Sequence, residues 1–246
     1  MSRRAWVRQI MGMPISIHVR AGDIDSPVIA RGVQAAFDIM DHADRLFSTY
    51  KQDSEVSRIR RGELDAGEAD PLVAQVISVC HQAGELTNGA FTDQLPGDDG
   101  VLGFDPTGLV KGWAGDRAAR QLANLLGAGY CLNAGGDVVV GAAAGETGEG
   151  PGAPWRVGIE DPRDRSRIAE VVELEHGAVA TSGTAARGAH LYDPLTGTFV
   201  ERTGSVTVIG PSLMWADVWA TALFVGPPSL LDVFAKVAHG YRVISL

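Results

Sequence analysis

The spacing of apolar residues changes along this chain, and that change constrains its fold more than any other feature. Over residues 27–50, apolar side chains recur every three to five positions, which is typical of a long amphipathic helix. Ser26 supplies a helix cap and Pro27 a first-turn proline. Further helices are predicted over 71–86, 111–126, 216–225 and 229–238.

Short apolar or alternating runs predict strands, and most of them lie in the C-terminal half of the chain. Turn-rich segments are predicted at 96–100 and 105–108, with a glycine-rich loop over 141–154. Because helices gather early and strands late, without regular alternation, the sequence predicts an α+β fold, a single domain over 1–246 with a largely antiparallel sheet flanked by helices. The predicted strands cover 14–19, 130–133, 138–140, 155–159, 168–174, 178–180, 204–209 and 241–244.

The 246-residue chain carries a formal net charge of −9, and 45% of its residues are apolar, enough for a substantial core. An acidic chain without a basic stripe is a poor candidate for nucleic acid, because Lys and Arg must neutralise the phosphates. An anionic small ligand would need local cations, helix N-termini or a bound metal. The two cysteines, Cys80 and Cys131, are predicted to be small buried apolar residues.

The N-terminal segment carries Arg3 and Arg4, but no apolar run of the kind found in secretory signals follows them. No cysteine suited to lipid anchoring lies near the start, and no apolar stretch is long enough to span a membrane. We therefore expect a cytoplasmic protein.

The segment DPTGLVKGWAGDRA, which starts at Asp105, joins a turn to a helix predicted to begin near Lys111. Such a turn directs backbone N–H groups and one ammonium toward an anionic ligand. Asp105 could receive the polar edge of a base or sugar. The alternative is that Asp105 is a turn residue and Lys111 a solvated cation.

The segment MWADVWATALFV places Asp217 and Thr221 four residues apart, on one face of a predicted helix. A carboxylate and a hydroxyl on an otherwise apolar helix need polar partners, and a hard cation such as Mg²⁺ would satisfy both. The alternative is that Asp217 caps a helix or pairs with a cation while Thr221 bonds back to its own helix.

Two further segments contain candidate site residues. His190 precedes a Pro/Gly turn within HLYDPLTG, where a histidine can act as a general base or be structural. The segment NAGGD (133–137) places a glycine pair between two strands, which allows close backbone approach but is not a dinucleotide-binding fingerprint.

The order of these segments resembles the ApbE family of FAD:protein FMN transferases over almost the whole chain. MGMPISIHV, FSTYKQDSEVSRI and TNGAF are similar to its N-terminal segments. The later segments DPTGLVKGWAGDRA, NAGGDVVVG, WRVGIEDP, VATSG, HLYDPLTG, SVTVIGP and ADVWATALFV follow in the family's order. The resemblance implies an ApbE-like, T-fold-like fold. It also implies a Mg²⁺-dependent transferase that cleaves FAD, moves FMN to a Thr or Ser of an acceptor flavoprotein and releases AMP.

The resemblance also implies roles for individual residues. His190 is the implied base beside the flavin phosphates. The metal positions are Asp217 and Thr221, with Gly108 and Met214 contributing through their backbones. The implied FAD contacts are Met11, Tyr50, Ala90, Phe91, Thr92, Asp105, Lys111 and His190.

Some positions depart from the family pattern. The segment between Phe91 and Asp105 is short, Thr92 replaces a common Asp, and the residues after TSG are Thr184, Ala185 and Ala186. These departures favour one alternative, a non-catalytic FAD-binding module. The other alternative is an FAD pyrophosphatase that uses water as acceptor, because the same site would serve with only the nucleophile changed. No Asp-x-x-Ser/Thr-Gly-Ala-Thr acceptor signature occurs in the chain, so self-flavinylation at that motif is not expected.

Overall fold

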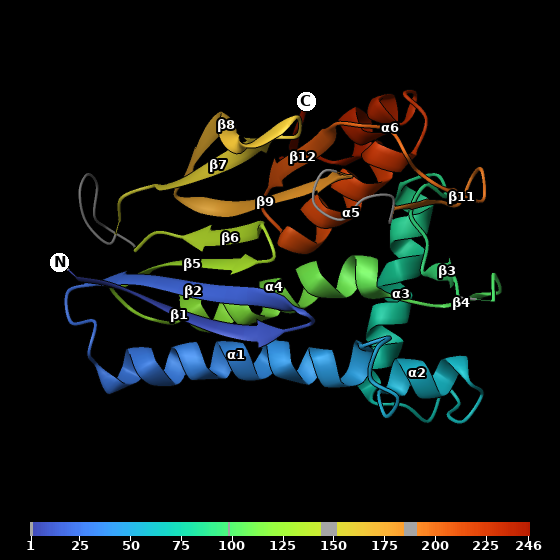
Figure 1. Cartoon of the computed structure of the whole chain (residues 1–246). Helices are drawn as coiled ribbons and strands as arrows, with labels where there is room; N and C mark the ends of the chain where they lie inside the picture. The colour runs from blue at the N-terminus through green and yellow to red at the C-terminus, as the bar shows by residue number, and fades with distance from the viewer. Residues whose placement is uncertain (1, 98, 144–151, 185–190) are drawn as a thin grey trace.

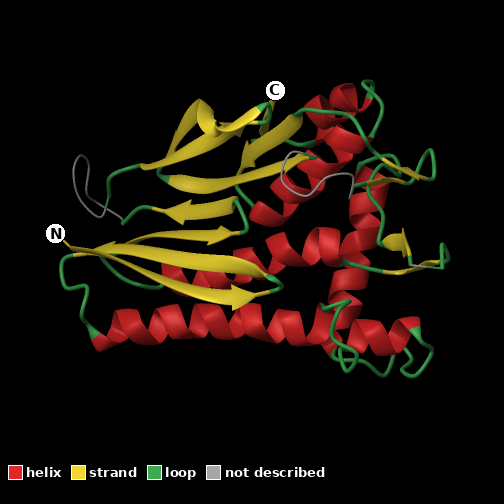
Figure 2. Cartoon of the chain, in the orientation of Figure 1, coloured by secondary structure: helices red, strands yellow, loops and turns green. Residues whose placement is uncertain are grey.

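The fold is built on a seven-stranded sheet in which every neighbouring pair is antiparallel. The computed structural model describes residues 2–97, 99–143, 152–184 and 191–246. Figure 1 shows the helices and strands, and Figure 2 colours them by type. In spatial order the strands are β1 (Ser2–Ile10), β2 (Met13–Ala21), β5 (Gly129–Ala134), β6 (Asp137–Gly141), β9 (His176–Gly183), β12 (Ser205–Gly210) and β13 (Arg242–Ser245).

Helices cover one face of this sheet. Alternate residues of the strands enter the main core, where they meet α1, α4 and α5, while α3 runs across the end of α1 (Figure 1). The α+β class with a largely antiparallel sheet is therefore confirmed. The helices are α1 (Pro27–Phe47), α2 (Glu55–Arg60), α3 (Pro71–Leu86), α4 (Thr107–Ala123), α5 (Leu213–Val225) and α6 (Leu230–Val237).

The opposite face of the sheet packs against a two-stranded hairpin. Ile159 and Val172 of that hairpin are buried with Val179 and Ile209 of the sheet. Val138 is also buried on this hairpin side, whereas its neighbour Val139 enters the main core, as expected for successive strand residues. The hairpin strands are β7 (Trp155–Asp161) and β8 (Asp164–Leu174), and the remaining short strands are β3 (Gln94–Pro96), β4 (Leu102–Phe104), β10 (Tyr192–Asp193) and β11 (Thr198–Phe199).

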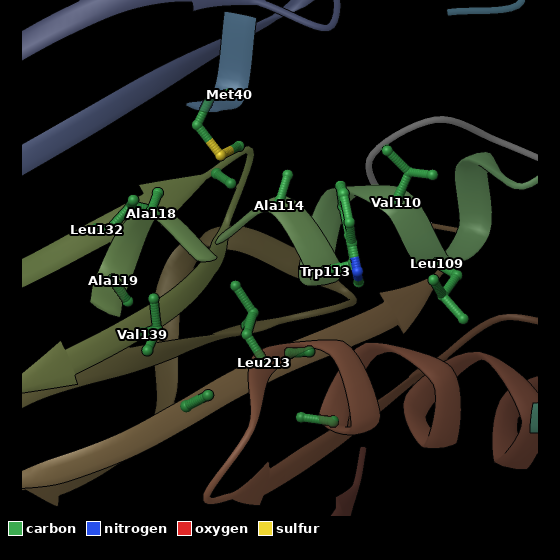
Figure 3. Packing of buried hydrophobic residues seen from close by; sticks show 14 of the residues in the cluster. Met40, Leu109, Val110, Trp113, Ala114, Ala118, Ala119, Leu132, Val139 and Leu213 are labelled. Atoms are coloured by element: carbon green, nitrogen blue, oxygen red, sulfur yellow. The ribbon is translucent and has the colours of Figure 1, made fainter. Parts of the chain in front are cut away.

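Helix α4 is the central element of the main core. Figure 3 shows its side chains between Met40 of α1, Leu132 and Val139 of the sheet, and Leu213 of α5. The contact with α5 depends on a missing side chain. A Cβ added at Gly112 would lie 2.6 Å from the Met214 Cα, closer than packed atoms can approach.

The predicted start of α4 near Lys111 was wrong, because the helix begins at Thr107. The Asp105 carboxylate accepts hydrogen bonds from the Thr107 N–H (3.0 Å) and hydroxyl (2.6 Å), and the intervening Pro106 restricts the backbone at the helix start. Lys111 therefore lies in the second turn rather than the first. The helix also ends earlier than predicted, at Ala123 rather than at 126.

Several other elements differ from the prediction. Strand β1 was missed, because its exposed arginines obscure the apolar pattern of an edge strand. Helix α2 and the short strands β3, β4, β10 and β11 were also missed, and α1 ends at Phe47 rather than at 50. Both cysteines are free thiols; Cys80 is buried as predicted, whereas Cys131 is only half-buried. Burial raises the pKa of Cys131 to about 11.

Among the described residues, none of the helices has the length and apolar character needed to cross a bilayer.

Candidate functional site

A cavity of about 640 Å³ lies where α1, α4, α5 and the ends of β6 and β9 meet. Its volume is in the range that holds a drug-sized or cofactor-sized ligand. Ten of the twelve residues that the sequence predicted for the site line this one cavity. They are Met11, Tyr50, Ala90, Phe91, Thr92, Asp105, Gly108, Lys111, Asp217 and Thr221.

The other two predicted residues do not join this set. His190 lies outside the described residues. Met214 lines a separate cavity of about 340 Å³ together with residues of α4 and of the start of α5. The backbone N–H of Met214 donates to an Asp116 oxygen at 3.1 Å, so this residue is part of the start of α5.

The centre of the main cavity holds one ammonium between two buried carboxylates. Lys111 Nζ contacts Asp137 Oδ2 and lies 3.4 Å from Asp217 Oδ1. Both aspartates are only 3% exposed, and an isolated buried carboxylate would be costly. The pairing of Asp217 with a cation is the alternative that the sequence left open, and in this structure Lys111 supplies that cation.

Asp137 was not among the predicted site residues. It is the first residue of β6 and follows Gly135 and Gly136, whose φ angles of 66° and 110° form the turn from β5. Its Oδ1 accepts a hydrogen bond of 3.0 Å from the backbone N–H of Thr181 on β9. The sequence signal that could have identified Asp137 is an acidic residue at the start of the apolar run of β6.

Two hydroxyls adjoin the carboxylates. Thr221 Oγ1 and Ser182 Oγ share a hydrogen bond of 2.9 Å, which joins α5 to β9. Both residues line the cavity with Asp217, which lies one helical turn from Thr221. Ser182 was also missed, although VATSG was among the segments that carried the resemblance.

This donor set fits Mg²⁺. Carboxylate and hydroxyl oxygens are hard ligands, and the Lys111 ammonium shows that a positive charge is favourable between Asp137 and Asp217. Within the described part of the chain, no group of three or more His, Cys, Asp or Glu side chains could hold a metal. A Mg²⁺ ion that is bound by few carboxylates and completed by substrate phosphates needs no such group.

Two turns with unusual backbone angles contribute to the walls of the cavity. Met11 (φ 55°) and Gly12 (φ 70°) form the tight turn between β1 and β2, which brings Met11 to the cavity. In TNGAF, Asn88 has φ 51°, and the Thr87 hydroxyl accepts from the Phe91 N–H at 3.0 Å. The second turn therefore fixes the backbone of Phe91.

Asp105 lines the cavity and has partners within the chain. Besides accepting from Thr107, it forms an ion pair with Arg60 at 3.4 Å. Arg60 lies on α2, a helix that was not predicted. Tyr50, also at the cavity, is 96% exposed and so presents its ring to solvent.

The model of the ApbE family matches residues 11–95 and 92–244. This chain belongs to the ApbE family. The resemblance found from the order of the sequence segments is thereby confirmed.

Relatives support the same family, and a solved structure shares the fold. The Escherichia coli K12 protein named FAD:protein FMN transferase is 27% identical over 256 residues, covering 80% of this chain and 72% of the relative. The protein of that name from Klebsiella pneumoniae is 34% identical over 160 residues, covering 61% and 44%. The ApbE protein of Thermotoga maritima shares the fold, with a TM-score of 0.80 at 24% identity, covering 99% of this chain and 94% of that one.

Proposed function

We propose that this member of the ApbE family is an FAD:protein FMN transferase. It would cleave FAD and attach FMN through a phosphoester bond to a Thr or Ser of an acceptor flavoprotein, with release of AMP. The observation that carries the proposal is a single cavity in which Lys111, Asp137, Asp217 and Thr221 meet. The printed names of the relatives give the same activity.

We assign the Mg²⁺ site to Asp217 and Thr221, with the backbone carbonyl of Gly108 as a further ligand. The buried carboxylate of Asp217, the cation already paired with it and the Thr221 hydroxyl one helical turn away support the assignment. When bound, Mg²⁺ would neutralise phosphate charge and polarise the phosphorus that is attacked.

The residues of the chain would bind and orient FAD. Lys111 brings an ammonium to a cavity in an acidic protein, where an anionic diphosphate otherwise meets repulsion. Met11, Tyr50 and Phe91 offer apolar and aromatic surface suited to a flavin ring. Asp105 and Thr92 at the cavity remain predicted polar contacts to FAD.

The proposed reaction is one displacement at phosphorus. The acceptor hydroxyl oxygen forms a bond to the FMN phosphorus, and the bond from that phosphorus to the bridging oxygen breaks. AMP leaves with that oxygen. The hydroxyl proton goes to a base, for which His190 remains the candidate from its sequence motif; such a base contributes about 10²–10⁴-fold to the rate.

The test combines the chain with FAD, Mg²⁺ and a flavoprotein domain that carries the Thr/Ser acceptor motif. We expect mass spectrometry to find FMN added to the acceptor, with an equal amount of AMP released. An acceptor with the target Thr replaced by Val is the matched control.

Two outcomes would overturn the proposal. Release of FMN and AMP at the same rate without acceptor would identify a pyrophosphatase. Tight FAD binding without AMP under any divalent metal would identify a binding module. The cytoplasmic location expected from the sequence stays a prediction, which fractionation of cells that express the protein would test.

A further inference from the structure

We infer that Asp137 is a positioning residue that holds Lys111 and thereby sets how readily Asp217 accepts a divalent cation. The inference rests on the proposed function, because that cation is the cofactor of the proposed reaction. Asp137 would act through Lys111 rather than as a ligand of the metal.

The first observation is that Lys111 is shared unequally between the two carboxylates. Its Nζ is in direct contact with Asp137 Oδ2, whereas Asp217 Oδ1 is 3.4 Å away. The lysine side chain is 22% exposed, and each carboxylate side chain is 4% exposed. Solvent screens interactions between charges this deeply buried only weakly. The distance of the ammonium from Asp217 therefore strongly affects how favourably that carboxylate binds another cation.

The second observation is that Asp137 is fixed by the sheet. Its Oδ1 accepts the 3.0 Å hydrogen bond from the Thr181 N–H, and β6 and β9 are paired strands. Its Oδ2 therefore has a set position from which it holds Lys111. Asp217 belongs to a different element, α5, and lies one turn from the Thr221 hydroxyl.

These positions imply a competition at Asp217. An ammonium and a divalent cation have the same sign of charge, so both cannot lie close to one carboxylate without repulsion. When a cation binds at Asp217, Lys111 can withdraw and stay on Asp137 within the same cavity. Without the Asp137 carboxylate, Lys111 would be drawn more strongly to Asp217 and would oppose the metal.

The test is a double-mutant cycle of metal binding in the absence of FAD and acceptor. The variants are Asp137→Asn, Lys111→Met and the double variant. Asn keeps an oxygen that can accept from the Thr181 N–H, so it removes charge with little change of shape. Mn²⁺ is the probe, because free Mn²⁺ is counted by electron paramagnetic resonance, and Mg²⁺ is then titrated as competitor.

We expect Asp137→Asn to weaken Mn²⁺ binding about tenfold in the wild-type background, within the range for coupled neighbours. In the Lys111→Met background the same change should alter binding less than about twofold, since the competitor is gone. Lys111→Met alone should tighten binding. A purely structural role of Asp137 would weaken binding in both backgrounds and would lower the melting temperature in parallel.

Equal weakening in both backgrounds would overturn the inference, because Asp137 would then act on the metal directly. No effect of Asp137→Asn, or no tightening by Lys111→Met, would overturn it as well. If Asp137→Asn does not fold, Lys111→Met alone still decides, through the sign of its effect. Because FAD and acceptor are absent, failure here is distinct from failure of the FMN transfer assay.

Discussion

Two aspartates along the contact between α4 and α5 are held in different ways. Asp116 accepts hydrogen bonds from the Ser212 hydroxyl (2.6 Å) and from the Leu213 (2.8 Å) and Met214 (3.1 Å) N–H groups, all at the start of α5. Asp217, further along α5, faces the ammonium of Lys111 instead. The donors to Asp116 are two backbone N–H groups and one short side chain, all fixed in position by the helix start. The ammonium on the long, flexible side chain of Lys111 can move away from Asp217, and another cation can take its place.

The two aspartates therefore differ in the role we expect for them. The hydrogen bonds to Asp116 hold the start of α5 in place, whereas the Asp217 carboxylate is paired with an ammonium that a bound cation can replace. We expect variants of Asp116 to change the free energy of unfolding. Variants of Asp217 should change turnover and metal dependence.

The largest effect is expected for Asp217→Ala. Removal of this carboxylate should abolish Mg²⁺-dependent AMP release, a loss of about 10³-fold or more, as found when a main electrostatic group is deleted from an active site. The measurement is AMP formed from FAD with acceptor present, by chromatography. Asp232→Ala on the exposed side of α6 is the matched control and should keep full activity. Full activity of Asp217→Ala would remove the metal assignment.

The next effect is expected for Asp116→Ala. Three donors at the start of α5 would lose their acceptor, and we expect a loss of about 2 kcal/mol in the free energy of unfolding. Urea unfolding followed by circular dichroism measures this quantity. If Asp116→Ala left the free energy of unfolding unchanged but lowered activity as much as Asp217→Ala does, Asp116 would have a role in the reaction and the proposed difference between the two aspartates would be wrong.

A comparable effect is expected for Gly112→Ala. The added Cβ would meet the Met214 backbone at 2.6 Å, and overpacking of this kind costs about 1–3 kcal/mol. For a chain of this length that corresponds to a fall in melting temperature of roughly 2–4 °C per kcal/mol. Gly22→Ala is the control, since a Cβ there has nothing within 4 Å. Equal melting temperatures of the two variants would contradict the close packing of α4 and α5.

The smallest effect is expected for Thr221→Val, which removes one hydroxyl at nearly constant volume. Ser182 loses its 2.9 Å partner, and the proposed site loses one neutral ligand but no charge. We expect the Mg²⁺ concentration for half-maximal AMP release to rise about tenfold, the value of one good hydrogen bond or ligand contact. Thr221→Ser should stay within a factor of two or three of the parent. An unchanged Mg²⁺ requirement in the Val variant would exclude Thr221 as a ligand.

The sequence predicted the fold class because α1 and α3 carry a clear helical period and the later strands carry clear apolar runs. It failed at β1, where Arg3, Arg4 and Arg8 lie on an exposed edge strand and obscure the alternation. It also failed at the start of α4, where the helix begins at Thr107, next to the hydrogen bond from the Thr107 N–H to the Asp105 carboxylate and before the apolar pattern of the helix begins. Local interactions of this kind change where a helix or strand begins and ends more readily than they decide whether it forms.

The candidate site was predicted largely through family resemblance, because the order of segments identified ten residues that line one cavity. Asp137 and Ser182 could not be predicted from spacing. Asp137 lies 26 residues after Lys111 in the sequence, and Ser182 lies 39 residues before Thr221. The pairing of β6 with β9, and the packing of α4 and α5 against these strands, bring the side chains together.

The order of the strands has a consequence for how the molecule opens. The first and last strands in the sequence, β1 and β13, form the two edges of the sheet, and the strands that bear Asp137 and Ser182 lie between them. Amide protons should therefore exchange with solvent fastest at both borders and slowest near the reaction centre. Opening of β13, or of β1 before its last residues, would leave the pairing of β6 with β9 intact.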